Sequence, residues 1–490
     1  MKQDGSAKAR PVFRWVVRTG SVLFYTLLGV GVVWLAAARW NGVPADPVGG
    51  AMRGAFGASV PIDPALDRTQ ALGAALAAIP PMPRLTLPAA PPGMKWLGRA
   101  NIPIDVDDAL SGAWTPETRP ILQGVIAYLE TPGVTAALSQ IASFEPGGWR
   151  PFGPNAPGIG LASVREAAKM FVARARYHHA GRSDVDAALA DLASTYRLSS
   201  TVFDSGQLIG PLVAIACIDL ANVELRRVAR EHDLTPAQVA DIRGVLRTYG
   251  LDRQQMWQNL TDAATEDLHR TVDRCWTDDG EGNGWLVLSR LDHVTPANRA
   301  RKPRCGAWNL LSPLFNDRRT VLGKITRLHE SQSKAAQLPY EKAVAFFEAT
   351  EGTGVFGLPD GPLSLAFLSR SPNTHETVVR TVTSSNATIV TVALSAYRHD
   401  HGEYPASLDE LVDEYLDRMP LDPYVDEPLH YRRDGEGFVL YSVGSNQVDD
   451  GGREATLATT GTQARWEGDL IYTEPRREPY FEPTLVDVQP

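Results

Sequence analysis

The longest hydrophobic pattern in the chain is an unbroken apolar run near its start. Residues 21–38, SVLFYTLLGVGVVWLAAA, carry no charge over 18 positions. As a helix rising 1.5 Å per residue, this run is about 27 Å long, close to the thickness of a bilayer's hydrocarbon core. Five basic residues and one acidic residue precede it, and Trp15 and Trp40 flank it. The pattern predicts a transmembrane anchor with a cytoplasmic N-terminus and an exported remainder.

A cleaved signal peptide is the alternative interpretation of this run. The small residues at 36–38 suit a signal peptidase, but the apolar run exceeds the usual length of about 7–15 residues. Both interpretations export the bulk of the chain, and the anchored one places it in the periplasm, on a bacterial inner membrane crossed once. We expect a basic leader over 1–20, the anchor over 21–38 and a Pro-, Ala- and Gly-rich tether over 39–93.

Helical spacing of apolar positions dominates the next segment, from 94 to 372. Residues 164–180 place small and aromatic side chains on one face, which predicts an amphipathic helix. A second helix is expected over 185–198, capped by Ser183 or Asp184. We therefore interpret 94–372 as a mostly α-helical exported domain.

Residues 208–223, LIGPLVAIACIDLANV, are apolar enough to raise the question of a second membrane span. The run is short and contains Pro211 and Asp219, so it predicts a buried core helix instead. Cys217 then becomes a small buried side chain of that helix. Pro236 follows Thr235 and opens a further helix, since proline suits the first turn.

The last part of the chain changes to a mixed pattern. A helix is expected from Asn373 or Thr374 to about His399, followed by short apolar runs of β type separated by Gly- and Asp-rich turns. The turn at 434–437 suits a hairpin between two of these runs. The predicted fold class is α+β, with a helix and a small antiparallel sheet over 373–480 and a tail over 481–490.

Five short motifs follow one another in this part of the chain. They are ALSAYRHDHGEYP at 393–405, PLDPY at 420–424, LHY at 429–431, YSVGSN at 441–446 and DLI at 469–471. Together they resemble the C-terminal globular domain of the major pseudopilin of type II secretion systems. The resemblance covers about one fifth of the chain. The helical region is similar to bacterial exported proteins to which no function is assigned.

The resemblance implies a calcium loop after the last strand. By motif position the ligand candidates are the backbone carbonyls of Val443 and Val448, with Asn446 and Asp469 at positions where the family has acids. Asp449 and Asp450 lie near enough in sequence to supply a missing charge. Calcium takes six to eight oxygen ligands, and carboxylates with backbone carbonyls supply them. A plain acidic turn is the alternative, because Gly468 stands where a further acid would help.

The sequence also departs from the pseudopilin pattern. The family's processing site is a glycine followed by a hydrophobic helix with Glu at its fifth position, but Gly20 is followed by residues 21–25 without Glu. The globular domain lies some 350 residues beyond the anchor instead of continuing the membrane helix. Assembly into a pilus by the family's usual route is therefore not expected, and we interpret 373–480 as a pseudopilin-like domain reused in a larger anchored protein.

Charge is distributed unevenly along the 490 residues. The whole chain has a net charge of −9, whereas residues 400–490 hold 21 acidic and 7 basic residues, a net charge of −14. An acidic chain without a basic surface stripe argues against nucleic-acid binding. Three cysteines argue against a disulfide scaffold or a structural zinc cluster, although Cys275 and Cys305 are a candidate disulfide in an oxidising compartment.

Other candidate sites have weaker patterns. Residues 279–284, DGEGNG, match the start of an EF-hand loop, but Arg290 replaces the twelfth-position acid, so we favour a turn. The HDH run at 399–401 could suggest a metal, and His178–His179 is placed at a helix end. No hydrolase, metalloprotease or nucleotide-binding motif is present.

These patterns lead to an expected function that is not enzymatic. We expect a membrane-anchored periplasmic binding or scaffold protein with protein partners, in association with a secretion or pilus-like apparatus. The alternatives are an exported hydrolase with an unrecognised site in the helical domain and an atypical pseudopilus subunit. A pocket lined by converging His, Asp and Ser would favour the hydrolase, and a shallow helical groove would favour binding.

Overall fold

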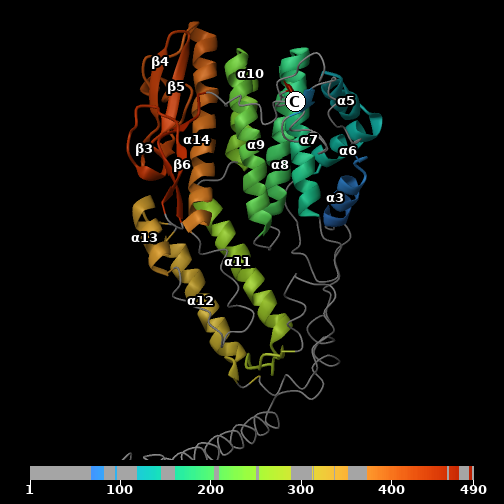
Figure 1. Cartoon of the computed structure of the whole chain (residues 1–490), viewed down its shortest axis with the longest axis vertical. Coiled ribbons are helices and arrows are strands. Elements are labelled where there is room, and N and C mark those ends of the chain that lie inside the picture. The colour runs from blue at the N-terminus through green and yellow to red at the C-terminus, as the bar shows by residue number, and fades with distance from the viewer. Residues whose placement is uncertain are drawn as a thin grey trace, which may run out of the picture. The chain divides into compact units, whose positions relative to one another are not determined.

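The computed structural model describes most of the chain from residue 68 onward (Figure 1). The expected tether over 39–93 is wrong in part, because residues 68–77 form a helix whose Leu72 is fully buried. The described residues are 68–81, 94–96, 119–144, 160–203, 209–249, 253–288, 312, 314–335, 337–350, 372–460, 463–473 and 485–487. The expected leader and the anchor at 21–38 lie outside them. Within the described ranges, no helix combines the length and the apolar character needed to cross a membrane.

The chain divides into two compact units. The larger unit comprises Ile62–Glu266, Ser331–Gly352 and Leu368–Pro490, and the smaller unit comprises Met1–Pro61, Asp267–Glu330 and Thr353–Phe367. The division therefore falls within helices α11 (Arg253–Cys275) and α12 (Arg318–Ala335).

The larger unit is mainly helical, as the amphipathic patterns predict. Its helices are α3 (Arg68–Ala77), α5 (Arg119–Leu129), α6 (Pro132–Ala142), α7 (Leu161–Arg176), the π-helical turn η2 (Tyr177–Gly181), α8 (Val185–Phe203), α9 (Ile209–Glu231), α10 (Pro236–Tyr249), α13 (Tyr340–Thr350) and α14 (Pro372–His401). Two 3₁₀ turns, η7 (Leu408–Leu411) and η8 (Gly444–Asn446), follow them. Helices α7, α8 and α9 pack on one another, and α14 packs against α9 (Figure 1).

The predicted helical pair around residue 181 is confirmed. The face of α7 that includes Phe171 and Ala175 is fully buried. The cap of α8 is Asp184, whose Oδ1 accepts a hydrogen bond from the backbone N–H of Ala187 at 3.1 Å. Ser183 instead adopts a left-handed conformation with φ of +56°. The chain thus leaves α7 through a π-helical turn and enters α8 through one capping residue, and α8 continues past the expected end at 198.

The apolar run at 208–223 forms a core helix, as predicted. It begins α9, in which Ile218 and Cys217 are buried. Burial raises the pKa of the Cys217 thiol to about 12, so this cysteine stays protonated and acts as a small apolar side chain. The next helix also begins where the sequence indicates, because Thr235 and Gln238 exchange backbone-to-side-chain hydrogen bonds of 2.9 and 3.3 Å at the start of α10.

A buried arginine joins α9 to α14. The Nη1 of Arg226 donates to the carbonyl of Ser384 at 3.0 Å and to the hydroxyl of Thr388 at 2.7 Å. Its guanidinium also lies over the ring of Tyr472, 5.0 Å from the ring centroid. Arg226 is 5% exposed, so these contacts replace hydration that its guanidinium loses on burial.

Two further polar contacts lie along the same interface. Asn222 donates to the hydroxyl of Ser385 at 3.0 Å, and Thr381 donates to the carboxylate of Asp219 at 2.7 Å. Burial raises the pKa of Asp219 to about 6, because the charged form loses its hydration. The two helices are therefore held together by polar groups within an otherwise apolar contact.

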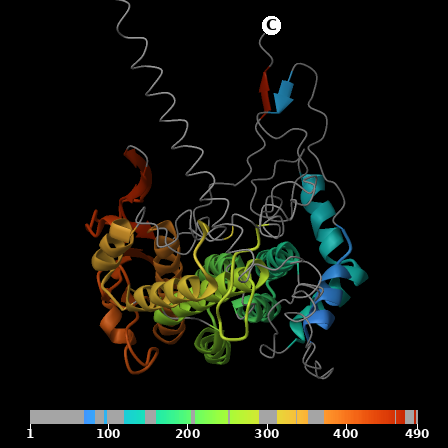
Figure 2. The ribbon, with the colours of Figure 1, turned by 90° about the horizontal axis from the view of Figure 1, so that it is seen from below.

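Short antiparallel strands complete the larger unit. A three-stranded sheet has the order β4 (His430–Asp434), β5 (Gly437–Ser442) and β8 (Leu470–Ile471). Two-stranded pairs are formed by β2 (Leu421–Asp422) with β3 (Glu427–Pro428), by β6 (Thr456–Thr460) with β7 (Gln463–Glu467), and by β1 (Met94–Trp96) with β9 (Leu485–Asp487), which Figure 2 shows side by side.

The predicted hairpin and the α+β class are confirmed. In the hairpin Tyr431 pairs with Leu440, and Gly435 occupies the turn with φ of +57°. Packing of β5 against α14 gives the helix-and-sheet arrangement expected for 373–480 (Figure 1). The long helix begins at Pro372, slightly before the expected caps, since proline suits a first helical position.

The compact units do not follow the sequence division into 94–372 and 373–480. The C-terminal residues share a unit and one continuous apolar core with the helices up to 266. The cause is the polar and apolar contact of α14 with α9, which leaves no solvent boundary between the two parts. Residues 267–330, which the sequence assigns to the helical domain, belong instead to the smaller unit.

The described part of the smaller unit has its own apolar cluster. Val272, Trp276, Leu286 and Ile325 are at most 2% exposed within it. The indole N–H of Trp276 donates to the carbonyl of Asn316 at 3.0 Å, which satisfies its one polar group. The described residues of 267–330 thus have an apolar cluster of their own.

Replacement of Arg226 tests the α9–α14 interface. Arg226→Met is expected to lower the free energy of unfolding by about 1–3 kcal/mol, because the Ser384 carbonyl and the Thr388 hydroxyl lose a buried donor. Urea unfolding followed by circular dichroism measures the change. Arg165→Met is the matched control, since Arg165 is 55% exposed. Equal free energies of unfolding for the two variants would contradict a stabilising role of Arg226 at this interface.

Candidate functional site

A groove in the larger unit lies between α10, α14 and the segment 416–426. Its cavity volume is about 660 Å³. We call it the α10–α14 groove, and its lining residues are Arg243, Leu246, Arg247, Arg253, Gln254, Val382, Asn386, Ile389, Val392, Leu416, Asp417, Arg418, Met419, Pro420, Leu421, Pro423 and Asp426. Leu421 is 44% exposed there, so part of the apolar lining faces solvent.

Positive charge predominates along this groove. Arg243 and Arg247 both pair with Asp417, at 3.3 and 2.7 Å. Arg253 donates to the carbonyl of Pro423 at 3.2 Å and lies 3.9 Å from Asp426. Four arginines therefore face two aspartates in the lining. Because exposed ion pairs contribute only about 0–1 kcal/mol, a carboxylate from another molecule can compete for these arginines.

A second cavity lies between α8, α9 and α10. Its volume is about 410 Å³, and its charged lining residues are Asp186, Arg197 and Asp241. Neither this cavity nor the α10–α14 groove contains a histidine or a serine in its lining. The convergence of His, Asp and Ser that would favour a hydrolase is not found in these two cavities.

The residues of the predicted calcium loop are only partly brought together. Asn446 donates to Asp450 at 3.0 Å, and the Oδ1 of Asp469 accepts from the backbone N–H of Asp450 at 3.2 Å. The Oδ2 of Asp469, which is fully buried, accepts from the N–H of Gly452 at 2.7 Å. Asn446, Asp450 and Asp469 thus form one hydrogen-bonded group.

Asp449 has hydrogen-bond partners outside that group. It accepts from the N–H of Gly451 at 2.8 Å and from the hydroxyl of Tyr441 at 3.0 Å, and these bonds lower its pKa. Val443, which precedes η8, is buried, and Val448 is 55% exposed. A calcium site here remains a prediction, and it would rest on the Asn446–Asp450–Asp469 group.

The remaining sequence candidates have structural partners or lie elsewhere. Asp279 accepts hydrogen bonds of 2.9 Å from Asn283 and from two backbone N–H groups, which lowers its pKa and agrees with a turn. Cys275 is buried, while Cys305 lies outside the described residues, so the disulfide stays a prediction. In the 399–401 run, the ring of His401 stacks on Tyr397 with centroids 4.0 Å apart.

A buried ionic group between α7, η2 and α9 is not indicated by any sequence motif. Glu224 is fully buried and pairs with Arg176 at 2.8 Å and with Arg227 at 2.6 Å. Its Oε1 lies 2.8 Å from the Nε2 of His179, whose ring is also fully buried. Burial alone would raise the pKa of Glu224, but Arg176 and the hydrogen bond from His179 outweigh it and lower the pKa to about 2.

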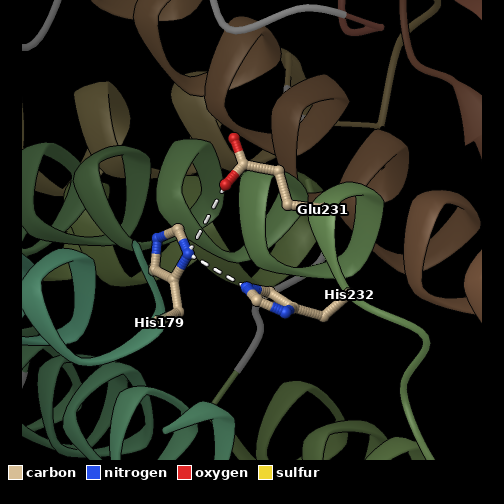
Figure 3. A group of neighbouring side chains, drawn as sticks. All are labelled: His179, Glu231 and His232. Carbon is tan, nitrogen blue, oxygen red and sulfur yellow. Dashed lines mark hydrogen bonds and ion pairs between the residues drawn. The ribbon is translucent and has the colours of Figure 1, made fainter. Parts of the chain in front are cut away.

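A histidine–glutamate cluster continues from this group (Figure 3). The Nδ1 of His179 lies 3.6 Å from the Oε2 of Glu231 and 3.3 Å from the Nε2 of His232. Burial lowers the pKa of His232, and the neighbouring His179 acts in the same direction. Among the described residues, these three form the only group of three or more His, Cys, Asp or Glu side chains with converging ligand atoms.

Sequence reasoning missed this cluster because its members are far apart in the chain. His179 was placed at a helix end, and the adjacent pair Glu231–His232 has no recognised spacing to it. The packing of α9 on the α7–η2–α8 segment brings them together. No local sequence signal marks the cluster; its marker in the structure is the rare π-helical turn that contains His179, since such turns are frequent at functional sites.

Comparison with protein-family models, curated proteins and solved structures finds no match to this chain. Functional inference therefore rests on the geometry and chemistry of its own residues.

Added Ca²⁺ tests the predicted loop. It is expected to raise the melting temperature, and a chelator should reverse the rise, because the ion would bind the folded state alone. Asp450→Asn should reduce the shift, since it removes one carboxylate of the group. Asp434→Asn, an exposed change in the same part of the chain, is the control. An unchanged melting temperature on both treatments would remove calcium from consideration.

Replacement of Glu224 tests the buried ionic group. Glu224→Gln is expected to lower the free energy of unfolding by about 3–5 kcal/mol, because Arg176 and Arg227 lose their buried counter-charge. The stabilisation by Glu224 is present above the pKa of the unfolded carboxyl and is lost as the pH falls through about 2, since the folded pKa is depressed. Urea unfolding at several pH values measures both effects.

Glu130→Gln provides the control for that measurement. Glu130 pairs with Arg182 at the surface, where the two side chains are 44% and 53% exposed. Its loss should cost no more than about 1 kcal/mol. A cost for Glu224→Gln as small as this one would show that the buried group does not stabilise the fold.

Proposed function

We propose that this chain is a membrane-anchored periplasmic binding or scaffold protein whose α10–α14 groove receives a segment of a protein partner. The observation that carries the proposal is the combination of apolar lining and excess arginine in one open groove of about 660 Å³. The anchor at 21–38 would hold the protein at a bacterial inner membrane, and the part of the tether that precedes α3 would hold the groove away from it.

The lining specifies the chemistry of the partner segment. Apolar side chains such as Ile389 and Met419 would bury apolar partner residues, and Arg243 and Arg247 would pair with partner carboxylates. A segment that alternates acidic and apolar residues therefore fits the groove best. Asp417 would act as an internal competitor that the partner's carboxylate displaces.

A link to a secretion or pilus-like apparatus rests on the motif order over 393–471. Those motifs resemble a type II secretion pseudopilin, and the helix-and-sheet arrangement of 373–480 is compatible with that resemblance. The groove is partly built by this pseudopilin-like region, through α14 and residues 416–426. An apparatus component is thus the class of partner we propose.

Charge reversal in the groove tests this function. The double variant Arg243→Glu, Arg247→Glu of the full-length anchored chain is expected to lose crosslinked partners captured from its native membrane, because two attractive charges become repulsive. Quantitative mass spectrometry of crosslinked material gives the readout. Arg165→Glu, Arg182→Glu is the matched control, since both arginines are exposed and each lies beside an exposed acid.

The outcomes of this experiment separate the proposals. Selective loss of one specific partner in the groove variant supports binding through the groove. Equal capture by both double variants would contradict it. Absence of any specific partner from the unmodified chain would remove the scaffold function as a whole.

A further inference from the structure

We propose that His179, Glu231 and His232 bind a divalent transition metal of the zinc class, with Glu224 supporting His179 from behind (Figure 3). The site lies at the end of α9 and includes no lining residue of the α10–α14 groove. It is therefore independent of the proposed partner binding.

The spacing of the ligand atoms matches tetrahedral coordination. Two ligand atoms that each lie about 2.0–2.1 Å from one tetrahedral zinc ion are about 3.3–3.4 Å from each other. The Nδ1 of His179 lies 3.3 Å from the Nε2 of His232 and 3.6 Å from the Oε2 of Glu231. All three ligand atoms lie within 4.8 Å of one another, so a small closure of Glu231 completes the set.

Glu224 orients His179 as a metal ligand. It lies 2.8 Å from Nε2, and its charge is held by Arg176 and Arg227, so Nε2 carries the proton and Nδ1 presents its lone pair to Glu231 and His232. Metal-ligating histidines commonly donate their second ring N–H to a carboxylate in this way. The buried carboxylate of Glu224 and its two arginines would thereby orient His179 toward the metal.

The backbone holds the other two ligands in place. They occupy the last residue of α9 and the position after it, where Arg398 of α14 donates to the carbonyls of Arg230 and His232 at 3.3 and 3.4 Å. Arg398 also pairs with Asp233 at 2.7 Å. Hydrogen bonds and an ion pair from Arg398 thus hold the segment that carries Glu231 and His232, both before and after the two ligands.

The donor set selects the class of metal. Two imidazoles and one carboxylate suit zinc and neighbouring transition metals, whereas calcium and magnesium require oxygen ligands. Three protein ligands leave a fourth position, and Glu231 is 38% exposed, so water can reach the ion from that side. Glu231 is the one anionic ligand, and the bound ion would keep a positive charge that favours an anionic fourth ligand.

Zinc binding by the full-length chain tests the site. The protein, purified in detergent and stripped with a chelator, is expected to take up one Zn²⁺ per chain in titration calorimetry and elemental analysis. His232→Gln should weaken zinc binding by at least about tenfold, since loss of even an outer-shell partner costs that much. Co²⁺ in place of Zn²⁺ should give the visible absorption of a tetrahedral ion, which a purely structural histidine would not produce.

His178→Gln is the matched control. It makes the same change one residue earlier, in a ring that lies 3.7 Å from Asp191 and outside the cluster. Where His232→Gln fails to fold, Glu231→Gln removes the ligand charge at a partly exposed position. Absence of stoichiometric zinc in the unmodified chain would overturn the proposal, as would equal weakening by the His178 and His232 changes.

Discussion

The charged side chains buried along α9 constrain the packing of the larger unit. Each buried charge must meet an opposite charge or a set of hydrogen bonds, because its hydration is lost. Residues two apart on a helix point about 200° apart, so Arg226 and Glu224 face opposite sides of α9. Arg226 donates to α14, and Glu224 pairs with Arg176 of α7, with His179 of η2 and with Arg227 of α9 itself. The neighbours of α9 on these two sides thus supply partners for its buried charges.

These buried polar contacts fix the position of each neighbouring helix along α9 more than they add to the free energy of unfolding. Replacing a buried ion pair by apolar groups is often neutral, whereas removing one partner is costly. Apolar contact between α9 and α14 would tolerate several sliding positions, but the bond from Arg226 to the Ser384 carbonyl forms in one. The same register fixes the Arg398 contacts at the end of α9 and the wall of the α10–α14 groove. One helix thus determines the geometry of both proposed sites.

Local patterns in the sequence predicted the elements well and the contacts between them poorly. The core helix at 208–223, the helix opened by Pro236 and the hairpin turn at Gly435 follow from hydrophobicity, proline and glycine, which act within a few residues. The His179–Glu231 contact depends on packing across 52 positions, which no local rule reports. Nearness in sequence likewise groups Asp449 with Asp450, although the first accepts from Tyr441 and the second from Asn446.

Helix α14 is rich in buried hydroxyl groups, and several of them are satisfied within the helix itself. Thr383, Thr388 and Thr391 donate to the carbonyl four residues earlier, at 2.8 Å in each case. Because these hydroxyls already donate within the helix, they require no hydrogen-bond acceptor from a neighbouring element. Recognition between the two helices is therefore asymmetric: α9 carries the charges that discriminate, and α14 offers a permissive surface. Substitutions accumulated over evolution should be tolerated more readily on α14 than at Arg226 or Asp219.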